Sequence, residues 1–288
     1  MNKILKWKIS QEIRLSFFLK EKLKKDYNAL DISQMIRNQR CLVNKKIERF
    51  ESTTLLPDDE VLVFPKKFSR IKFDSNRILL DSPYYLIYNK PAYISSEQLA
   101  KTLQLQIIHR LDRDTTGCII FSKSKKNNLK LINLFKKKII SKQYLAYVSK
   151  APNQKQGIIK SFLHVKKRRE GALVMASSPF PDKGKLAITQ WKLLKKTKFG
   201  AIILCSPITG RTHQIRLHLY DNGFPIIGDL EYQNFNNSKY FAFRYLLHAF
   251  SLSFTCPFTN KKIKVSNDIM PEPIYYFSST QDIKFLNY

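Results

Sequence analysis

Two kinds of residue are scarce in this chain of 288 residues, and each scarcity removes a class of protein. The four cysteines lie far apart and form no C-x-x-C pair: Cys41, Cys118, Cys205 and Cys256. This spacing excludes a disulfide framework and a cysteine zinc site, so we expect buried thiols in a reducing compartment. Acidic residues number 22 against 51 Lys and Arg, which leaves a formal charge of +29. The excess predicts a polyanionic partner, first nucleic acid and second an anionic membrane surface.

Long apolar runs are absent as well. No stretch approaches the roughly 18 apolar residues that a membrane helix needs. Glu12 and Arg14 interrupt the first apolar stretch, where a secretory signal would have its core. We therefore expect a soluble, cytoplasmic protein. Hydrophobic residues make up 43% of the chain and aromatic residues 12%, enough for a sizeable core, which excludes a disordered basic protein.

The most informative stretch spans residues 107 to 124. Apolar pairs and runs at 107–108 and 118–121 predict two buried strands, and the charged segment between them predicts a turn that ends at Gly117. Asp112 would then project from a loop held by rigid elements, with Arg110 and Arg113 beside it. On composition alone, the ordinary interpretation of such a segment is a charged surface turn.

Four segments argue for more than a surface turn. His109-Arg110-Leu111-Asp112, followed by Thr-Thr-Gly at 115–117, resembles the HRLD-x-x-T-S-G signature of the RluA-type pseudouridine synthases, with Thr116 in place of Ser. Residues 209–218 match the TGRTHQIRxH motif of the same family, and residues 142–148 resemble its K-x-Y-x-A-x-V strand. Residues 84–91 are similar to its "vvnKPaG" segment, although Tyr93 occupies the usual Gly position. The resemblance covers residues 10 to about 275.

The resemblance implies a reaction and assigns roles. A pseudouridine synthase breaks the bond between uracil N1 and ribose C1′ and joins C5 to C1′. The family's catalytic aspartate corresponds to Asp112, the tyrosine that stacks on the target base to Tyr144, and the arginine expected to pair with the aspartate to Arg216. Asp114 falls on a variable position of the motif. Because the uridine must leave its stack, Arg110 is the candidate for filling the vacated space. Further RNA-binding candidates are Arg113, Thr116, Arg211, His213 and Gln214.

Residues 10–70 predict a small separate domain. An apolar stripe predicts a helix within 10–25, and Asp31 or Ser33 could cap a second helix. A strand entering a turn at 41–46 and a closing strand at 61–64 follow. This order resembles the S4 RNA-binding domain, whose V-N-G turn appears here with Lys45 in place of Gly. The resemblance makes these residues RNA-contact candidates: Arg14, Arg37, Arg40 and Lys45.

The expected fold class is α+β: an S4-like αα-β domain at 10–70, then a catalytic domain at 71–288 with a mixed, largely antiparallel central sheet flanked by helices. Within the second domain we expect a strand ending at Pro91 and a helix at 125–140 whose apolar stripe is Leu129, Ile132, Phe135 and Ile139. Two hairpins should occupy 157–200, with the basic cluster 166–169 on an exposed loop and a strand at 186–191.

The expected function is isomerisation of uridine to pseudouridine in structured RNA, ribosomal in preference to transfer RNA, by a monomer. No cofactor and no metal are expected, because uracil leaves as a stabilised anion. Whether the route is a covalent adduct or a glycal stays open. One alternative is a catalytically silent S4-type RNA-binding or ribosome-assembly factor. Another is a metal-dependent nuclease, which would need clustered carboxylates; His213 and His218, five residues apart, would lie on different helix faces.

Overall fold

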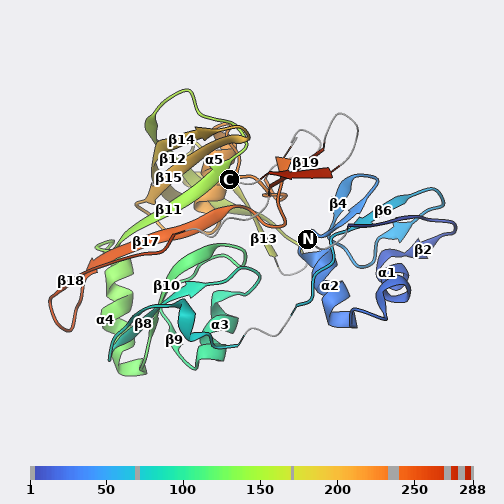
Figure 1. The fold of residues 1–288 in the computed structure, drawn as a ribbon. Helices are drawn as coiled ribbons and strands as arrows, with labels where there is room; N and C mark the ends of the chain where they lie inside the picture. Colours follow the sequence, from blue (N-terminus) through green and yellow to red (C-terminus); the bar gives the residue numbers. More distant parts are fainter. Residues whose placement is uncertain are drawn as a thin grey trace. The chain divides into compact units, whose positions relative to one another are not determined.

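The computed structural model describes residues 4–68, 72–169, 172–232, 240–268, 274–277 and 283–286. The backbone contacts divide the chain into two units (Figure 1). The first unit holds residues 1–70 with the short segments 235–237 and 242–244, and the second unit holds the rest. Each unit has its own sheet and its own core, so each is described separately.

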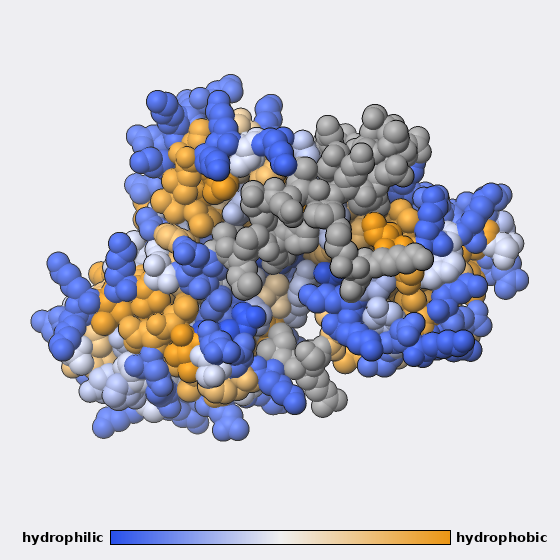
Figure 2. All heavy atoms as spheres, in the orientation of Figure 1, coloured by the Kyte–Doolittle hydropathy of each residue, from blue (hydrophilic) through white to orange (hydrophobic). Residues whose placement is uncertain are grey.

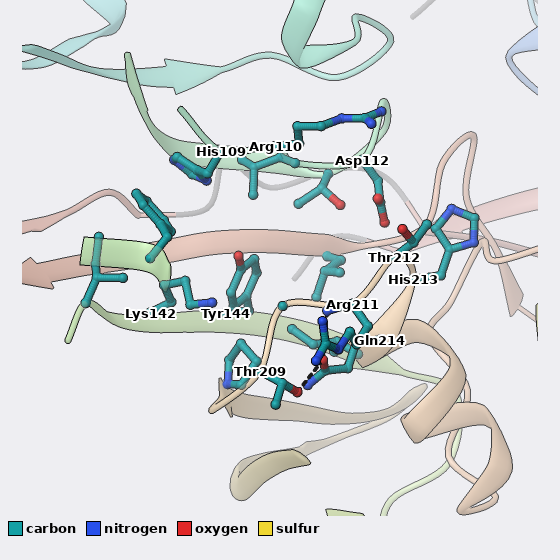
Figure 3. A pocket seen from close by; sticks show the side chains of 18 of the residues that line it. His109, Arg110, Asp112, Lys142, Tyr144, Thr209, Arg211, Thr212, His213 and Gln214 are labelled. Carbon is teal, nitrogen blue, oxygen red and sulfur yellow. Dashed lines mark hydrogen bonds between the residues drawn. The ribbon is translucent and has the colours of Figure 1, made fainter. Parts of the chain in front are cut away.

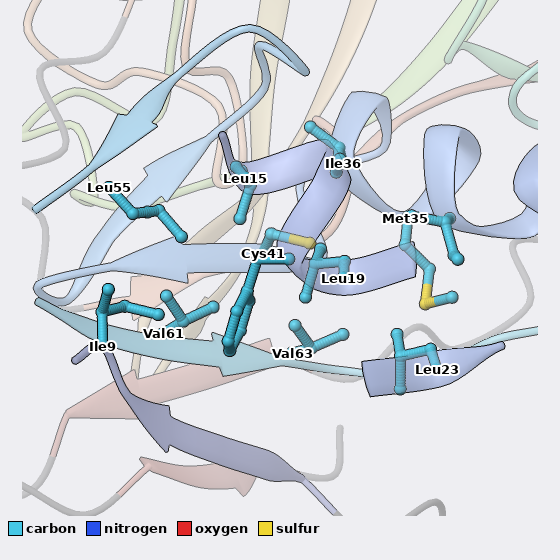
Figure 4. Packing of buried hydrophobic residues seen from close by; sticks show 12 residues of the cluster. Ile9, Leu15, Leu19, Leu23, Met35, Ile36, Cys41, Leu55, Val61 and Val63 are labelled. Atoms are coloured by element: carbon cyan, nitrogen blue, oxygen red, sulfur yellow. The ribbon is translucent and has the colours of Figure 1, made fainter. Parts of the chain in front are cut away.

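The first unit packs two helices on a small antiparallel sheet. The sheet has the order β1-β6-β3-β4, formed by β1 (Leu5–Lys8), β6 (Glu60–Val63), β3 (Cys41–Val43) and β4 (Lys46–Glu48). A second pair joins β2 (Ile13–Arg14) to β5 (Thr54–Leu55), and the helices are α1 (Leu15–Leu23) and α2 (Ala29–Arg37). Figure 4 shows apolar side chains of both helices meeting those of the strands, among them Leu19, Met35 and Val63, all fully buried.

Helix α2 begins earlier than the sequence indicated. Its cap is Asn28, whose side chain accepts a hydrogen bond from the backbone N–H of Asp31 at 2.9 Å, while the Asp31 carboxylate accepts one from the N–H of Asn28 at 3.3 Å. The expectation that Asp31 or Ser33 is the cap was therefore wrong. Asp31 instead completes a capping box from the third helical position. Its other oxygen accepts a hydrogen bond from the N–H of Phe68, which explains why this carboxylate is buried.

The turn between β3 and β4 carries the residue that the sequence flagged as unusual. Asn44 and Lys45 both have positive φ, +49° and +65°, as in a type I′ hairpin turn. Asn44 suits this turn because its side chain donates to the Asp59 carboxylate and accepts from the N–H of Glu60. Lys45 adopts a conformation in which glycine carries no steric penalty.

The second unit is built on one eleven-stranded sheet. Nine strands run in the order β13-β12-β14-β15-β11-β17-β10-β8-β7, while β18 pairs with β17 and β9 with β10. The bounds are β7 (Ile78–Asp81), β8 (Tyr85–Lys90), β9 (Gln106–Ile107), β10 (Thr116–Ser122), β11 (Ser141–Val148), β12 (Gln156–Arg169), β13 (Ala172–Ser178), β14 (Lys185–Thr197), β15 (Gly200–Pro207), β17 (Leu247–Thr255) and β18 (Lys262–Ser266). Only the β10–β17 pair is parallel among those described. The expected α+β class with a mixed, largely antiparallel sheet is confirmed.

Short helices accompany this sheet. They are α3 (Ser96–Leu103), α4 (Lys125–Lys136) and α5 (Gln214–Asp221), with single 3-10 turns at η1 (Ser75–Arg77) and η2 (Pro181–Lys183). A separate three-stranded sheet joins β16 (Tyr240–Phe241), β19 (Ile274–Phe277) and β20 (Ile283–Leu286).

Helix α4 presents a different face to the core than its sequence suggested. Leu131 and Leu134 are buried, whereas Leu129 is 71% exposed and Ile139 is 60% exposed. The helix stops at Lys136, so Ile139 lies beyond its end and cannot share a stripe with the preceding turns. Of the expected stripe, only Ile132 and Phe135 pack against this core.

The basic cluster at 166–169 is not on a loop. It forms the end of β12, where Lys167 pairs with Val174 in β13. Both Lys166 and Lys167 are exposed. A hairpin whose outer strand is the edge of the sheet tolerates charged side chains because water reaches them.

The strands that hold the site are buried on both faces. In β8 and β10, successive residues alternate between two cores: Ile87 and Ile120 point into one, and Leu86 and Phe121 into the other. Burial on both faces explains why these strands have continuous apolar runs instead of alternating ones. The segment between β9 and β10 is therefore anchored on a rigid support.

The face of the molecule drawn in Figure 2 is largely polar. On this face, most projecting side chains are hydrophilic. All four cysteines are buried and free, as expected. No helix in the described ranges combines the length and apolar character needed to cross a membrane.

Candidate active site

A cavity of about 750 Å³ lies in the second unit beside the motif that contains Asp112. Three stretches supply most of its lining: residues 107–112 with Thr115, the end of α4 with Lys142 and Tyr144 of β11, and residues 207–216. Figure 3 shows Asp112 and Lys142 toward opposite ends of the view, with Tyr144 between them. Two of the strongest sequence motifs thus face one another across a single cavity.

The loop that presents Asp112 is held by its backbone. Ser96 Oγ accepts a hydrogen bond from the N–H of Leu111 and donates one to the Leu111 carbonyl, both at 2.9 Å. The buried Lys90 ammonium donates to the carbonyl of Arg113 at 2.8 Å and to those of Pro91 and Ile94. With its neighbours fixed in this way, the half-buried Asp112 carboxylate is free to face the cavity.

Gly117 has a role other than the expected turn. It lies inside β10, opposite Ala249 of the parallel neighbour β17, with φ at +106°. A Cβ on Gly117 would stand only 2.3 Å from the Ala249 carbonyl oxygen. Glycine is required here because the two strands approach closely just after the loop that carries Asp112, not because the chain turns.

Arg216 is buried and fully engaged by carboxylates. Its Nε and Nη2 donate to the two oxygens of Asp229, each at 2.7 Å, and Nη2 also donates to Glu231 at 2.7 Å. The guanidinium lies 4.1 Å from the ring centre of Tyr245 and 4.9 Å from that of Tyr232. Burial lowers the pKa of Arg216. The charge and hydrogen bonds of Asp229 raise it, as do the smaller contributions of Tyr245 and Asp112, and the pKa lies well above its usual value.

The expected direct pair between Arg216 and Asp112 is replaced by this arrangement. Among the described residues, the two-pronged partner of Arg216 is Asp229, and Asp112 contributes electrostatic attraction. Asp229 takes this place because both of its oxygens accept hydrogen bonds from the planar guanidinium, which is the strongest pairing geometry for an arginine. Arg216 therefore acts on Asp112 as a fixed positive charge.

Tyr144 lines the cavity and stays a neutral phenol. Burial, and then the negative charge of Asp112, raise its pKa far above that of free tyrosine. A phenol with a raised pKa is a poor proton acceptor at neutral pH, whereas its ring still offers a stacking surface. Stacking on a base is therefore the role that this environment favours.

His213 and Gln214 differ in what they can offer a ligand. His213 lines the cavity, shares a hydrogen bond of 2.7 Å with the Tyr232 hydroxyl, and has its pKa lowered by burial and by Arg216. Gln214 is buried, and its amide is used within the protein: it donates to the Ile188 carbonyl and the Thr189 hydroxyl, and accepts from Thr209 and Arg211. Its side chain holds the 209–211 loop against β14 at the lining of the cavity. That Gln214 contacts RNA stays a prediction.

The other candidates near the motif are spread around the cavity. Arg110 extends away from Tyr144 in Figure 3 and pairs with Glu97 at 2.6 Å. Arg113 pairs with Asp114 at 3.0 Å and, like Thr116, is not part of the cavity lining. Thr116 instead shares a hydrogen bond of 2.8 Å with His248. Arg211 is exposed at the cavity and donates from Nε to the Leu186 carbonyl.

The four candidates of the first unit belong to its surface or its edges. Arg14 is exposed just before α1, and Arg37 is exposed and pairs with Glu51. Arg40 is half-buried and donates to the Phe64 carbonyl at 3.4 Å, and Lys45 is half-buried in its turn. Whether these cations contact RNA stays a prediction.

Sequence reasoning missed several residues that shape the site. Asp229 and Tyr232 lie shortly after the motif at 209–218, but nothing in the sequence gave them Arg216 as a partner. Tyr245 had no sequence signal, yet it is buried and its side chain hydrogen-bonds Thr115. Lys142 appeared only as the first letter of a strand motif, although it lines the cavity. Among the described residues, no group of three or more His, Cys, Asp or Glu side chains is arranged to hold a metal ion.

Comparisons with known proteins show the family of this chain. Residues 84–221 match the family model described as RNA pseudouridylate synthase. The chain is 31% identical over 291 residues to a "Ribosomal large subunit pseudouridine synthase C" of Buchnera aphidicola subsp. Baizongia pistaciae, a match that covers 89% of this chain and 90% of that protein. It is 30% identical over 235 residues to the protein of the same name in Rickettsia prowazekii, which covers 75% of each.

Solved structures match in fold. Human RNA Pseudouridylate Synthase Domain Containing 1 superposes with a TM-score of 0.59 at 23% identity, over 75% of this chain and 92% of the human chain. Human RNA Pseudouridylate Synthase Domain Containing 4 gives a TM-score of 0.55 at 22% identity, over 68% and 89% of the two chains. At these identities the likeness concerns the backbone.

Proposed function

This chain belongs to the RNA pseudouridylate synthase family and isomerises uridine to pseudouridine in RNA, and we propose that its substrate is the RNA of the large ribosomal subunit and its catalytic carboxylate Asp112. The observation that carries the assignment of Asp112 is its place in the cavity with Tyr144 and Arg216. The substrate is supported by the names of the relatives that align over most of the chain.

The reaction requires little beyond one carboxylate and a shaped cavity. The N1–C1′ bond breaks, uracil departs as an anion while remaining bound, and C5 then bonds to C1′ and loses its proton. Positive charge develops at C1′ when the first bond breaks, and an anionic carboxylate can stabilise that carbon or attack it. From its position in the cavity, Asp112 can attack C1′, which gives a covalent adduct, or accept the C2′ proton of the charged sugar, which gives a glycal.

The neighbours of Asp112 have separate tasks. The neutral Tyr144 ring offers a platform for the flipped uracil. Arg216, fixed by Asp229, supplies a positive charge that attracts the Asp112 carboxylate and keeps it oriented. Tyr245 closes the other side of Arg216, so the charge is held in a low-dielectric environment where it acts more strongly than in water.

The first unit, with its exposed cations, is proposed to bind RNA in the manner of an S4 domain without taking part in the chemistry. Its candidate contacts are Arg14, Arg37, Arg40 and Lys45. Ribosomal RNA is proposed as substrate in preference to transfer RNA, and the protein is proposed to act as a monomer in the cytoplasm. The basic excess of the whole chain supports a polyanionic substrate.

Pseudouridine mapping of total RNA tests this proposal. A strain that lacks the gene should lose pseudouridine at one or a few positions of large-subunit RNA, and the wild-type gene should restore them. A gene carrying Asp112→Asn should not. Unchanged large-subunit RNA in the deletion strain, together with loss at sites in transfer RNA, would contradict the proposed substrate.

A further inference from the structure

The cavity extends well beyond the residues that the reaction uses. One end holds Asp112, His213 and Arg216, and the lining continues past Tyr144 to Phe135, Lys136, Lys138 and Ile140 at the end of α4. A single flipped uridine, stacked on Tyr144 with its C1′ at Asp112, would leave this second end open. An RNA substrate necessarily carries a phosphodiester on each side of that uridine.

One wall of the second end is an uncharged stack of two rings. The ring of His109 stacks on Phe135 with centroids 4.3 Å apart, and its Nε2 accepts a hydrogen bond from the N–H of Ile120 at 3.0 Å. Burial, with the nearby charge of Lys142, lowers the pKa of His109 to about 3. His109 is therefore neutral at physiological pH and presents a flat ring to the cavity.

Lys142 projects into this end without an anionic partner. It lies two residues before Tyr144 in β11, so both side chains emerge on the same face of the strand. Among the described residues its ammonium makes no hydrogen bond or ion pair, and burial lowers its pKa. A Cβ on Gly210 would lie 3.6 Å from the Lys142 Nζ, so the absence of a side chain at Gly210 leaves the ammonium accessible.

The charge around Lys142 has one sign. Lys136 and Lys138 line the same end, and Arg211 lies on the opposite loop. The only carboxylates in the lining are Asp112, at the other end, and Glu97, which is paired with Arg110. A half-buried ammonium in such surroundings is best compensated by a full negative charge. Uracil is neutral until its bond breaks, whereas a phosphodiester is always anionic.

We propose that Lys142 binds the phosphodiester directly next to the flipped uridine, and that the cavity end formed by His109, Phe135 and Lys142 receives the neighbouring nucleotide. This inference rests on the proposed function, since it takes RNA as the ligand. It makes Lys142 a substrate-anchoring residue, distinct from the residues that act on C1′.

The test uses an RNA stem-loop that contains a uridine mapped as the enzyme's target. Two further copies carry a neutral methylphosphonate in place of the phosphate on the 5′ or the 3′ side of that uridine. For the wild-type protein, one of the two copies should bind roughly tenfold more weakly, the loss expected for one charge-assisted hydrogen bond. Lys142→Met should bind the unmodified RNA with a similar loss and should not respond further to that methylphosphonate. The matched control is Lys126→Met, an exposed lysine of α4 outside the cavity lining, which should keep the full methylphosphonate penalty.

Rates at saturating RNA separate anchoring from chemistry. With a phosphate role, Lys142→Met raises the RNA concentration needed for half-maximal rate and leaves the saturated rate near that of the wild type. Lys142→Arg should recover part of the affinity, because it keeps the positive charge. A Lys142→Met protein that still shows the full methylphosphonate penalty, or that loses rate only at saturation, overturns the inference. If the wild-type protein forms no pseudouridine in this RNA, the proposed function fails instead, and the two failures are therefore distinguishable.

Discussion

Arg216 illustrates how one residue can serve the site without touching the reacting atoms. Its guanidinium lies against the rings of Tyr232 and Tyr245 and is paired with the carboxylate of Asp229. Buried ion pairs of this kind are costly to break, because either partner left alone is an uncompensated charge. We therefore regard Arg216 as a positioning residue for Asp112, whose charge attracts it across the cavity.

Arg216→Lys should therefore fail to support activity. An ammonium keeps the charge but cannot make two parallel hydrogen bonds to Asp229, so the charge would shift from its place. We expect the rate of pseudouridine formation to fall roughly a hundredfold, as when a preorganised donor is removed from an active site. The control is Arg77→Lys, since Arg77 pairs with Asp74 outside the cavity lining, where 34% of its side chain is exposed. Single-turnover assays of both variants should show the difference, and a near wild-type rate for Arg216→Lys would argue against this role.

A second prediction at this scale concerns the strained turn of the first unit. Lys45 has φ at +65°, and Lys45→Gly should relieve about 1–2 kcal/mol of steric cost. Glycine loses about 0.5–1 kcal/mol through chain entropy, so a small net stabilisation is expected. Lys46→Gly, one position later in β4, should only destabilise, because Lys46 has no positive φ to relieve. Denaturant unfolding of the two variants measures the contrast; destabilisation by both to the same extent would show that the turn is not strained.

At the scale of elements, the sequence predicted best where burial is continuous. Strands β8 and β10 were recognisable because their apolar runs are bounded by Pro91 and by the charged loop before β10. Strand β11, which is only partly buried, was recognisable from the motif around Tyr144. The face of α4 was misjudged, since several choices of apolar residues fit a helical period and only the packing selects Leu131 and Leu134. The basic end of β12 was taken for a loop because charge in a solvated edge hairpin resembles charge in a turn.

The site was predictable in part for the same reason. Asp112 and Tyr144 were found through local motifs. The ion pair between Arg216 and Asp229 and the contact between Arg216 and the Tyr245 ring join segments that only the fold brings together. Gln214 belongs to the motif at 209–218, which suggested that it binds RNA. Its hydrogen bonds to β14 could not be predicted from the spacing of residues in the sequence. The motifs therefore indicated which residues form the site, and the contacts made in the fold determine the role of each.

The close approach of β10 to β17 leads to a prediction for Gly117. Gly117→Ala would place a methyl group 2.3 Å from the Ala249 carbonyl oxygen and would also require a positive φ. We expect a loss of about 2–5 kcal/mol in unfolding free energy, with reduced activity because the Asp112 loop leads directly into this strand. Gly223→Ala is the matched control: its φ is also positive, at +81°, but no atom lies within 4 Å of the added carbon. It should cost only about 1–2 kcal/mol. Thermal unfolding distinguishes the two, and equal losses would contradict a steric role for the strand contact.

For the whole molecule, the division into two units suggests a division of labour. The site residues Asp112, Tyr144 and Arg216 all belong to the second unit, while Arg14 and Lys45 belong to the first. A charge of +29 makes affinity for RNA dependent on salt, since each phosphate contact releases counterions. Contacts made by the first unit should therefore appear in binding and not in the rate of the chemical step.

The double variant Arg14→Gln, Lys45→Gln in the full chain tests this division. If both cations contact phosphates, the slope of log affinity against log salt should fall by about 0.7 to 0.9 for each. The single-turnover rate at saturating RNA should stay close to that of the wild type. Filter binding over a range of salt concentrations gives the slope. An unchanged slope and affinity would mean that these residues do not bind the RNA.

Asp112 is the proposed catalytic carboxylate, and its neighbour Asp114 provides the sharpest control. Asp114 lies in the same loop but outside the cavity lining, with its side chain 14% exposed and paired with Arg113. Asp114 is therefore less solvated than a simple turn carboxylate, and Asp114→Asn should cost up to about 1 kcal/mol of stability without removing activity. Asp112→Asn keeps the shape of the side chain and removes the charge needed at C1′.

The decisive measurement is tritium release from C5-labelled uridine in the target RNA, with RNA binding measured on the same protein samples. Asp112→Asn should release no tritium, while its RNA affinity should stay within a few-fold of that of the wild type. Asp114→Asn should release tritium at close to the wild-type rate. Release at the wild-type rate by Asp112→Asn would contradict the assignment, and so would its loss in Asp114→Asn alone.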